Sequence, residues 1–167
     1  DPRPMKRKIQ QFFFPSLTAG FLLRAAILAV STYLLCLYVC IPFRIQGASM
    51  EPTYRDGGFN FCFTPVFWFS EPRRHQVVVI RLAGTQIMLL KRVVALAGEV
   101  VEFRQGRLWV NGRKIHEPYV HFAGDWELPP RQVEEGHVYV IGDNRNHPMH
   151  RHSFGQVSIQ RILGVPL

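Results

Sequence analysis

The strongest β-hairpin signal in the chain is Leu108-Trp109-Val110-Asn111-Gly112-Arg113-Lys114-Ile115. Asparagine and glycine both tolerate the positive φ angles of a two-residue type I′ turn, so this pair predicts a tight turn between two antiparallel strands. Immediately upstream, residues 100–103 and 107–110 are patterned as strands around Gln105-Gly106. The stretch therefore predicts a small antiparallel β-sheet.

Strand patterns continue on both sides of this hairpin. Phe59, Phe61 and Phe63 recur at the two-residue period of a strand. A turn at Ala83-Gly84 is expected between two runs of β-branched and apolar residues, whereas residues 116–136 contain three prolines and are predicted to be irregular. The further predicted strands are residues 59–63, 76–81, 86–96, 137–141 and 157–165. We expect a mainly β fold.

An apolar segment precedes this β region. Residues 17–43 contain one charge, Arg24, and residues 25–43 approach the ~20 residues that cross a bilayer core. This run is longer than the core of a cleaved export signal, so we expect a retained transmembrane anchor. The basic residues cluster in residues 1–16, which predicts a cytoplasmic tail and an extracytoplasmic domain formed by residues 44–167. The expected location is the bacterial inner membrane.

Composition narrows the classes of partner. The 167 residues carry a net charge of +8, and 47% of them are hydrophobic, which argues against disorder. Because the basic residues flank the apolar run, we expect contact with membrane phospholipid, and no nucleic-acid-binding motif is present. Cys36 and Cys40 lie in the apolar run and Cys62 stands alone, so no disulfide framework is predicted.

Two short stretches suggest nucleophilic chemistry: Gly47-Ala48-Ser49-Met50-Glu51-Pro52-Thr53 and Lys91-Arg92-Val93-Val94. Taken singly, Ser49 is an ordinary loop serine and Lys91 an ordinary surface lysine at a strand end. Together they form a nucleophile and base, provided that Lys91 is neutral. This requires its pKa to fall by ~3 from the usual ~10.4, which its apolar neighbours on the strand can achieve by burial.

These stretches and Gly142-Asp143-Asn144-Arg145, in this order behind an apolar segment, resemble type I signal peptidases. The resemblance extends from about residue 25 to the end of the chain. It implies a membrane-bound Ser/Lys endopeptidase on a small antiparallel β scaffold, which needs no metal or cofactor. Its substrates would be exported preproteins, cut after small-x-small sequences such as Ala-x-Ala. Ser49 would be the nucleophile and Lys91 the general base.

The resemblance also implies supporting roles. Gly47, Ser49, Met50 and Pro52 would form the oxyanion hole and substrate groove, and the site would be buttressed by Asp143, Asn144 and Arg145. Many bacterial members have a serine at the position of Gly47, so here the Ser49 backbone N–H would have to do more to stabilise the oxyanion.

A larger departure follows Arg145. Where the family usually has Ser-x-Asp-Ser-Arg, this chain has Pro148-Met149-His150-Arg151-His152. The hydroxyl, the acid and the arginine of the family pattern are all absent. With His147, these histidines have irregular spacing and no acidic residue among them, so we expect no metal site but sensitivity to pH near neutrality.

Competing hypotheses remain at this stage. The altered loop also fits a narrow-specificity maturation peptidase of a conjugation or pilus system. A catalytically impaired homologue that only binds exported segments is a third possibility, although retention of Ser49 and Lys91 argues against it. The aromatic loop Thr64-Pro65-Val66-Phe67-Trp68-Phe69 either packs in the core or dips into the membrane surface. The self-cleaving SOS-type repressors share the Ser/Lys pair, but this chain lacks their DNA-binding half.

Overall fold

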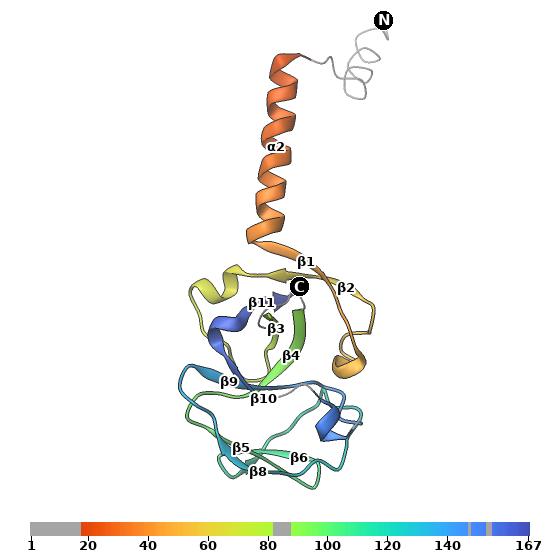
Figure 1. Cartoon of the computed structure of the whole chain (residues 1–167), viewed down its shortest axis with the longest axis vertical. Coiled ribbons are helices and arrows are strands. Elements are labelled where there is room, and N and C mark those ends of the chain that lie inside the picture. The colour runs from red at the N-terminus through yellow and green to blue at the C-terminus, as the bar shows by residue number, and fades with distance from the viewer. Residues whose placement is uncertain (1–17, 82–87, 147, 153–154) are drawn as a thin grey trace, which may run out of the picture. The chain divides into compact units, whose positions relative to one another are not determined.

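The computed structural model describes residues 18–81, 88–146, 148–152 and 155–167, so the predicted tail, the Ala83-Gly84 turn and His147 lie outside the described residues. The described chain forms two units, a helix ending at Tyr38 and a β unit from Val39 to Leu167 (Figure 1). Helix α2, Ala19–Tyr38, has a mean hydropathy of 1.9 and buries none of its side chains. It is long and apolar enough to span a membrane.

The boundary between anchor and β unit differs from the sequence expectation. Helix α2 begins before residue 25, and the end of the expected span, residues 40–43, lies in strand β1, Cys40–Arg44. Strand β1 pairs antiparallel with β2, Phe59–Phe63, from Cys40↔Phe63 to Arg44↔Phe59. The expected span ran past Tyr38 because residues 40–43 are as apolar as the helix. Pro42, which disfavours helical backbone at and before its own position, is the sequence feature that agrees with the observed boundary.

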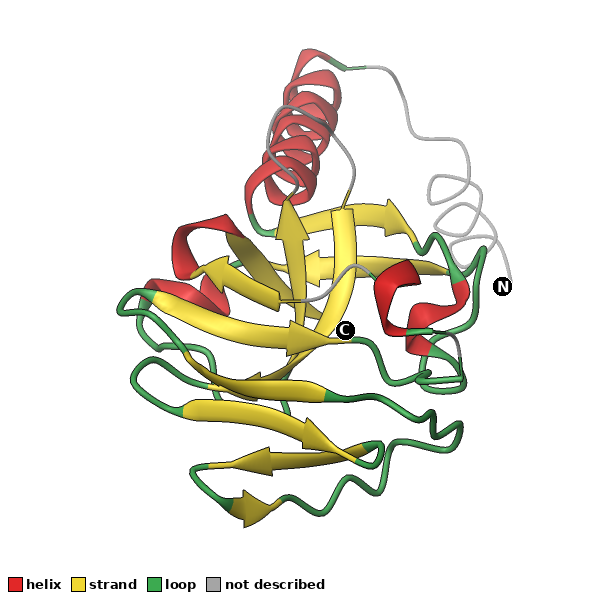
Figure 2. Ribbon diagram, turned by 60° about the horizontal axis from the view of Figure 1, so that its bottom comes forward, coloured by secondary structure: helices red, strands yellow, loops and turns green. Residues whose placement is uncertain are grey.

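The β unit contains two antiparallel sheets (Figure 2). The seven-stranded sheet has the order β1-β2-β11-β3-β4-β9-β10 and includes β3 (Val77–Arg81), β4 (Met88–Ala95), β9 (His137–Ile141), β10 (Gly155–Ser158) and β11 (Ile162–Pro166). The four-stranded sheet has the order β7-β6-β5-β8, with β5 (Val100–Arg104), β6 (Arg107–Val110), β7 (Arg113–Lys114) and β8 (Leu128–Gln132). The prediction of a mainly β fold is confirmed.

The Asn111-Gly112 hairpin forms as predicted. Asn111 and Gly112 have φ angles of 52° and 70° and join β6 to β7. The turn before β6 likewise uses positive φ, at Gln105 and Gly106. Strand β8 was not predicted, and the expectation of an irregular 116–136 segment is wrong there. Because β8 is an edge strand, its two prolines remove no hydrogen bond from the centre of a sheet.

Apolar residues of both sheets form three clusters. One joins β5, β6 and the end of β4 around Phe103 and Trp126. The second packs Met50 and Cys62 with β1 and β4, and the third packs β3, β4 and β9 together. Strand β4 contributes to all three clusters, and six of its eight residues are buried, Lys91 among them. A polar side chain on this strand is therefore held in a dry, rigid setting.

The aromatic loop, residues 64–69, is partly packed and partly exposed. It contains the 3₁₀ turn η2, Pro65–Trp68, in which Phe67 packs against the cluster of β3, β4 and β9. Trp68 and Phe69 are 58% and 92% exposed. The core interpretation is right for Phe67, and two large apolar side chains remain on the surface.

Candidate active site

Ser49 lies in the 3₁₀ turn η1, Ala48–Met50, which follows β1. Gly47 precedes it with φ 88°, a conformation suited to glycine, and its N–H donates to Asp56 Oδ1 at 2.8 Å. Met50, next in the chain, is 1% exposed and packs with Leu90 in the core. The buried Met50 anchors the turn, so the partly buried Ser49 is held on a fixed backbone.

Lys91 comes from the middle of β4, opposite Val78 of β3. It is 3% exposed, and its Nζ lies 2.8 Å from Ser49 Oγ. Burial lowers the pKa of Lys91 from 10.5 to about 8, although the negative charge of Asp143 acts in the opposite direction. The structure therefore brings together two residues 42 positions apart and makes the Lys91 amine easier to deprotonate than that of a free lysine.

The loop Gly142-Asp143-Asn144-Arg145, which follows β9, holds the Ser49 turn from the other side. Asn144 N–H donates to Ser49 O at 3.0 Å, and Asn144 Nδ2 donates to Ala48 O at 3.1 Å. A Cβ at position 142 would overlap the Ser49 carbonyl oxygen, so only glycine allows the loop to approach this closely. The loop thus fixes the carbonyl groups on either side of the Ser49 nitrogen.

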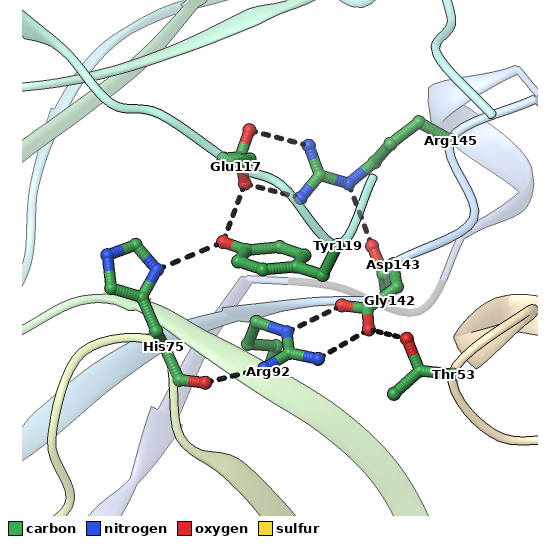
Figure 3. A network of polar contacts seen from close by, with 8 residues as sticks. All are labelled: Thr53, His75, Arg92, Glu117, Tyr119, Gly142, Asp143 and Arg145. Carbon is green, nitrogen blue, oxygen red and sulfur yellow. Dashed lines mark hydrogen bonds and ion pairs between the residues drawn. The ribbon is translucent and has the colours of Figure 1, made fainter. Parts of the chain in front are cut away.

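A buried ion pair secures this loop to β4 (Figure 3). Arg92 donates through Nε to Asp143 Oδ1 at 2.8 Å and through Nη2 to Oδ2 at 2.6 Å, and Asp143 is fully buried. Thr53 Oγ1 also donates to Oδ2 at 2.6 Å. Charge-assisted, two-point pairing of this kind is strong and geometrically specific. Arg92 and Thr53 belong to the conspicuous sequence motifs, but no role was predicted for either residue.

A second buried ion pair was missed altogether. Arg145, 2% exposed, donates through Nη2 to Glu117 Oε1 at 2.8 Å and through Nη1 to Oε2 at 3.3 Å. Tyr119 OH donates to the same carboxylate at 2.9 Å, and His75 Nδ1 lies 3.2 Å from the Tyr119 oxygen (Figure 3). Glu117 and Tyr119 belong to an irregular segment in which no periodicity or motif draws attention to them.

The remaining expected groove residue, Pro52, is exposed, as is Gly47. The loop that departs from the family pattern contains the 3₁₀ turn η3, Met149–Arg151, in which His150 is exposed. His152 lies edge-on to Trp126, with ring centroids 4.6 Å apart. Within the part of the chain that the structure describes, no cluster of three or more His, Cys, Asp or Glu side chains could hold a metal ion.

The chain is similar to known proteins along most of its length. Residues 18–166 match the family described as signal peptidase, peptidase S26. Signal peptidase I of Bacillus licheniformis is 32% identical over 155 residues, which cover 84% of this chain and 82% of that protein. Signal peptidase I T of Bacillus subtilis is also 32% identical, over 84% of this chain and 79% of that protein.

A plant protein and a solved bacterial structure are also similar to this chain. Thylakoidal processing peptidase 1 of Arabidopsis thaliana is 30% identical over 74% of this chain and 39% of that protein. The crystal structure of a signal peptidase I from Enterococcus faecalis has a TM-score of 0.45 and 26% identity, covering 57% of this chain and 97% of that one. The family match spans almost the whole described chain, and the two Bacillus relatives are similar along most of their length. The chain belongs to the signal peptidase family, peptidase S26, and is a serine endopeptidase.

Proposed function

We propose that this enzyme removes N-terminal signal peptides from exported preproteins by Ser/Lys acyl-enzyme catalysis. One observation carries the proposal: the 2.8 Å contact between Lys91 Nζ and Ser49 Oγ, made by a lysine that is 3% exposed. The substrate class follows from the relatives, which are named signal peptidases. A serine nucleophile needs a neighbouring base. A buried lysine whose pKa is lowered to about 8 supplies one.

In the acylation step, Ser49 Oγ attacks the scissile carbonyl carbon while its proton passes to the neutral Lys91 amine. The Ser49 backbone N–H stabilises the oxyanion that develops. The tetrahedral intermediate collapses when the C–N bond breaks, and the Lys91 ammonium returns the proton to the leaving amine. The new N-terminus of the mature protein departs, and the signal peptide remains as an ester on Ser49.

Deacylation uses the same pair in the same way. Lys91 is neutral again, so it can take a proton from water as the water oxygen attacks the ester carbonyl. Collapse of the second intermediate breaks the C–O bond and returns the proton to Ser49 Oγ. The signal peptide leaves with a carboxylate, and the serine is regenerated. Asp143, Asn144 and Arg145 take no part in proton transfer and instead hold the Ser49 turn in place.

The enzyme acts at the membrane in this proposal. Helix α2 spans the bacterial inner membrane with the basic tail in the cytoplasm, and residues 39–167 act on the far side. Exposed Trp68 and Phe69 contact phospholipid beside the catalytic unit. Met50 and Pro52 belong to the region that selects small residues next to the cut, which gives Ala-x-Ala-like specificity.

The test is cleavage of a preprotein by the full chain in detergent, with the cut mapped by mass spectrometry. We expect one cut after the small-x-small site and none when the residue before the cut is changed to tryptophan. Folded Ser49→Ala should give no product. Cleavage by that variant, or cutting elsewhere in the preprotein, would reject the proposal. Cleavage of one preprotein among a varied set would favour a narrow maturation peptidase, for which the altered Pro148–His152 loop is the motivating feature.

A further inference from the structure

The segment from Glu117 to Trp126 lies directly against the 142–145 loop. Besides the Glu117–Arg145 ion pair, Arg145 N–H donates to Phe122 O at 2.9 Å. A Cβ on Gly124 would overlap the Arg145 carbonyl oxygen, so the two backbones are in close contact. The segment therefore forms a support that touches the loop through a side chain and through the main chain.

Glu117 is the charged centre of this support. Its side chain is 9% exposed and faces a guanidinium that is 2% exposed, so both charges are largely withdrawn from water and pair mainly with each other. The Arg145 guanidinium carbon also lies 5.4 Å and 5.5 Å from the ring centroids of Phe103 and Trp126. With its guanidinium fixed in this way, Arg145 donates through Nε to Gly142 O at 2.7 Å. Glu117 thus acts on the start of the loop, next to Ser49.

Tyr119 joins the two buried ion pairs. Its hydroxyl donates to Glu117, and its ring lies over Arg92, with the guanidinium carbon 4.0 Å from the ring centroid. Burial raises the pKa of Tyr119 well above its usual value, so the hydroxyl remains a donor throughout the neutral range. His75 Nδ1 faces the other side of the hydroxyl oxygen at 3.2 Å.

These contacts define a path that ends at the reacting pair (Figure 3). Glu117 holds Arg145, which holds Gly142, and Tyr119 covers Arg92, which holds Asp143. Asn144, the residue after Asp143, donates to the Ser49 carbonyl. The same loop places Asp143, whose charge acts on Lys91. A displacement of ~1 Å in such a loop can cost ~100-fold in rate even when the reacting groups are intact.

We propose that Glu117 and Tyr119 are positioning residues for the Ser49–Lys91 pair, acting through Arg145 and Arg92 to fix the 142–145 loop against the serine turn. The proposal rests on the proposed function, since it concerns the same reaction. Neither residue touches the substrate in this account. Their removal should therefore lower the rate of the chemical step and leave substrate affinity nearly unchanged.

The experiment is single-turnover cleavage of a fluorogenic signal-peptide substrate by the full chain in detergent, with enzyme in excess. Because folded enzyme remains in excess, a partly unfolded preparation does not lower the maximal rate constant, and half-saturating concentrations are counted as folded enzyme. Glu117→Gln keeps the shape of the side chain and removes its charge. Tyr119→Phe keeps the ring over Arg92 and removes only the hydroxyl. His121→Gln, at an exposed position of the same segment, is the matched control.

We expect the maximal rate constant to fall ~10-fold or more in Glu117→Gln and ~3-fold or more in Tyr119→Phe, following the ~100-fold scale for misplaced catalytic groups. The half-saturating enzyme concentration should stay within about two-fold of the parent value, as expected when only transition-state interactions are lost. His121→Gln should match the parent. Parent-like rate constants in Glu117→Gln overturn the proposal. If Glu117→Gln does not fold, a parent-like Tyr119→Phe overturns it instead.

Ser49→Ala in the same assay separates the two proposals. No cleavage by Ser49→Ala, combined with parent-like Glu117→Gln and Tyr119→Phe, rejects the positioning roles and leaves the Ser/Lys mechanism standing. Cleavage by folded Ser49→Ala rejects the mechanism itself. A rise in half-saturating concentration without a fall in the maximal rate constant would place Glu117 and Tyr119 in substrate binding, which contradicts the positioning proposal.

Discussion

Raising the pH from 6 to 9 should increase kcat/KM by about 90-fold, because the reaction requires neutral Lys91, whose pKa is lowered to about 8. With that pKa, the neutral fraction is about 1% at pH 6, about 9% at pH 7 and about 90% at pH 9. An unperturbed lysine would be neutral in only about 0.03% of molecules at pH 7. Burial of Lys91 on β4 thus raises the fraction of enzyme with a neutral Lys91 about 300-fold at pH 7.

The assay is kcat/KM for a short peptide substrate across this pH range, with folding monitored at each pH. The profile should rise with unit slope and level off above pH 8, since one proton must be lost. Lys91→Arg should be inactive at every pH, because a guanidinium keeps its proton throughout this range. A pH dependence that disappears in His150→Gln would assign control to the altered loop and refute the reasoning.

Three further outcomes follow from the same structure. Gly142→Ala should lower kcat by ~100-fold, because the added Cβ overlaps the Ser49 carbonyl oxygen, whereas Gly20→Ala, in open space, should not; equal activities would contradict the close approach. Folding lowers the pKa of Lys91 from 10.5 to about 8, so the folded protein loses stability as the pH falls through this range. Lys91→Met should therefore raise the free energy of unfolding by ~3 kcal/mol at pH 7, measured by thermal unfolding. The same substitution should give no such gain above pH 10.5. In reconstituted vesicles, brominated phospholipid should quench tryptophan fluorescence less in Trp68→Phe than in the parent, and equal quenching would exclude lipid contact at this exposed side chain.

Local patterns predicted those elements whose structure is set locally. The Asn111-Gly112 turn follows from backbone preference, and the alternation of phenylalanines at residues 59–63 matches β2. Strand β1 was assigned to the membrane span because apolar content alone does not distinguish a strand from the end of a helix. Strand β8 was missed because its prolines argue against a strand, and only its position at a sheet edge makes them acceptable.

The reacting pair of the site was predicted from the sequence, whereas Glu117 and Tyr119 were not. Ser49 and Lys91 were paired through short motifs and a family resemblance, since spacing cannot show that residues on η1 and β4 meet. Their contact depends on the position of β4 between β3 and β9 in the sheet, and on the loop after β9 that holds the Ser49 turn. Glu117 and Tyr119 left no signal, because their importance comes from burial against Arg145 and Arg92 and not from any local pattern.

The central claim is that Ser49 and Lys91 act as one unit, and a double-mutant cycle on single-turnover preprotein cleavage tests it most directly. Because the pair performs one proton transfer, Ser49→Ala and Lys91→Ala should each abolish nearly all activity, and the double variant should be little worse than either. Each variant is compared in the folded state with the parent chain. Losses that add across the two sites, or substantial cleavage by folded Lys91→Ala, would contradict the account.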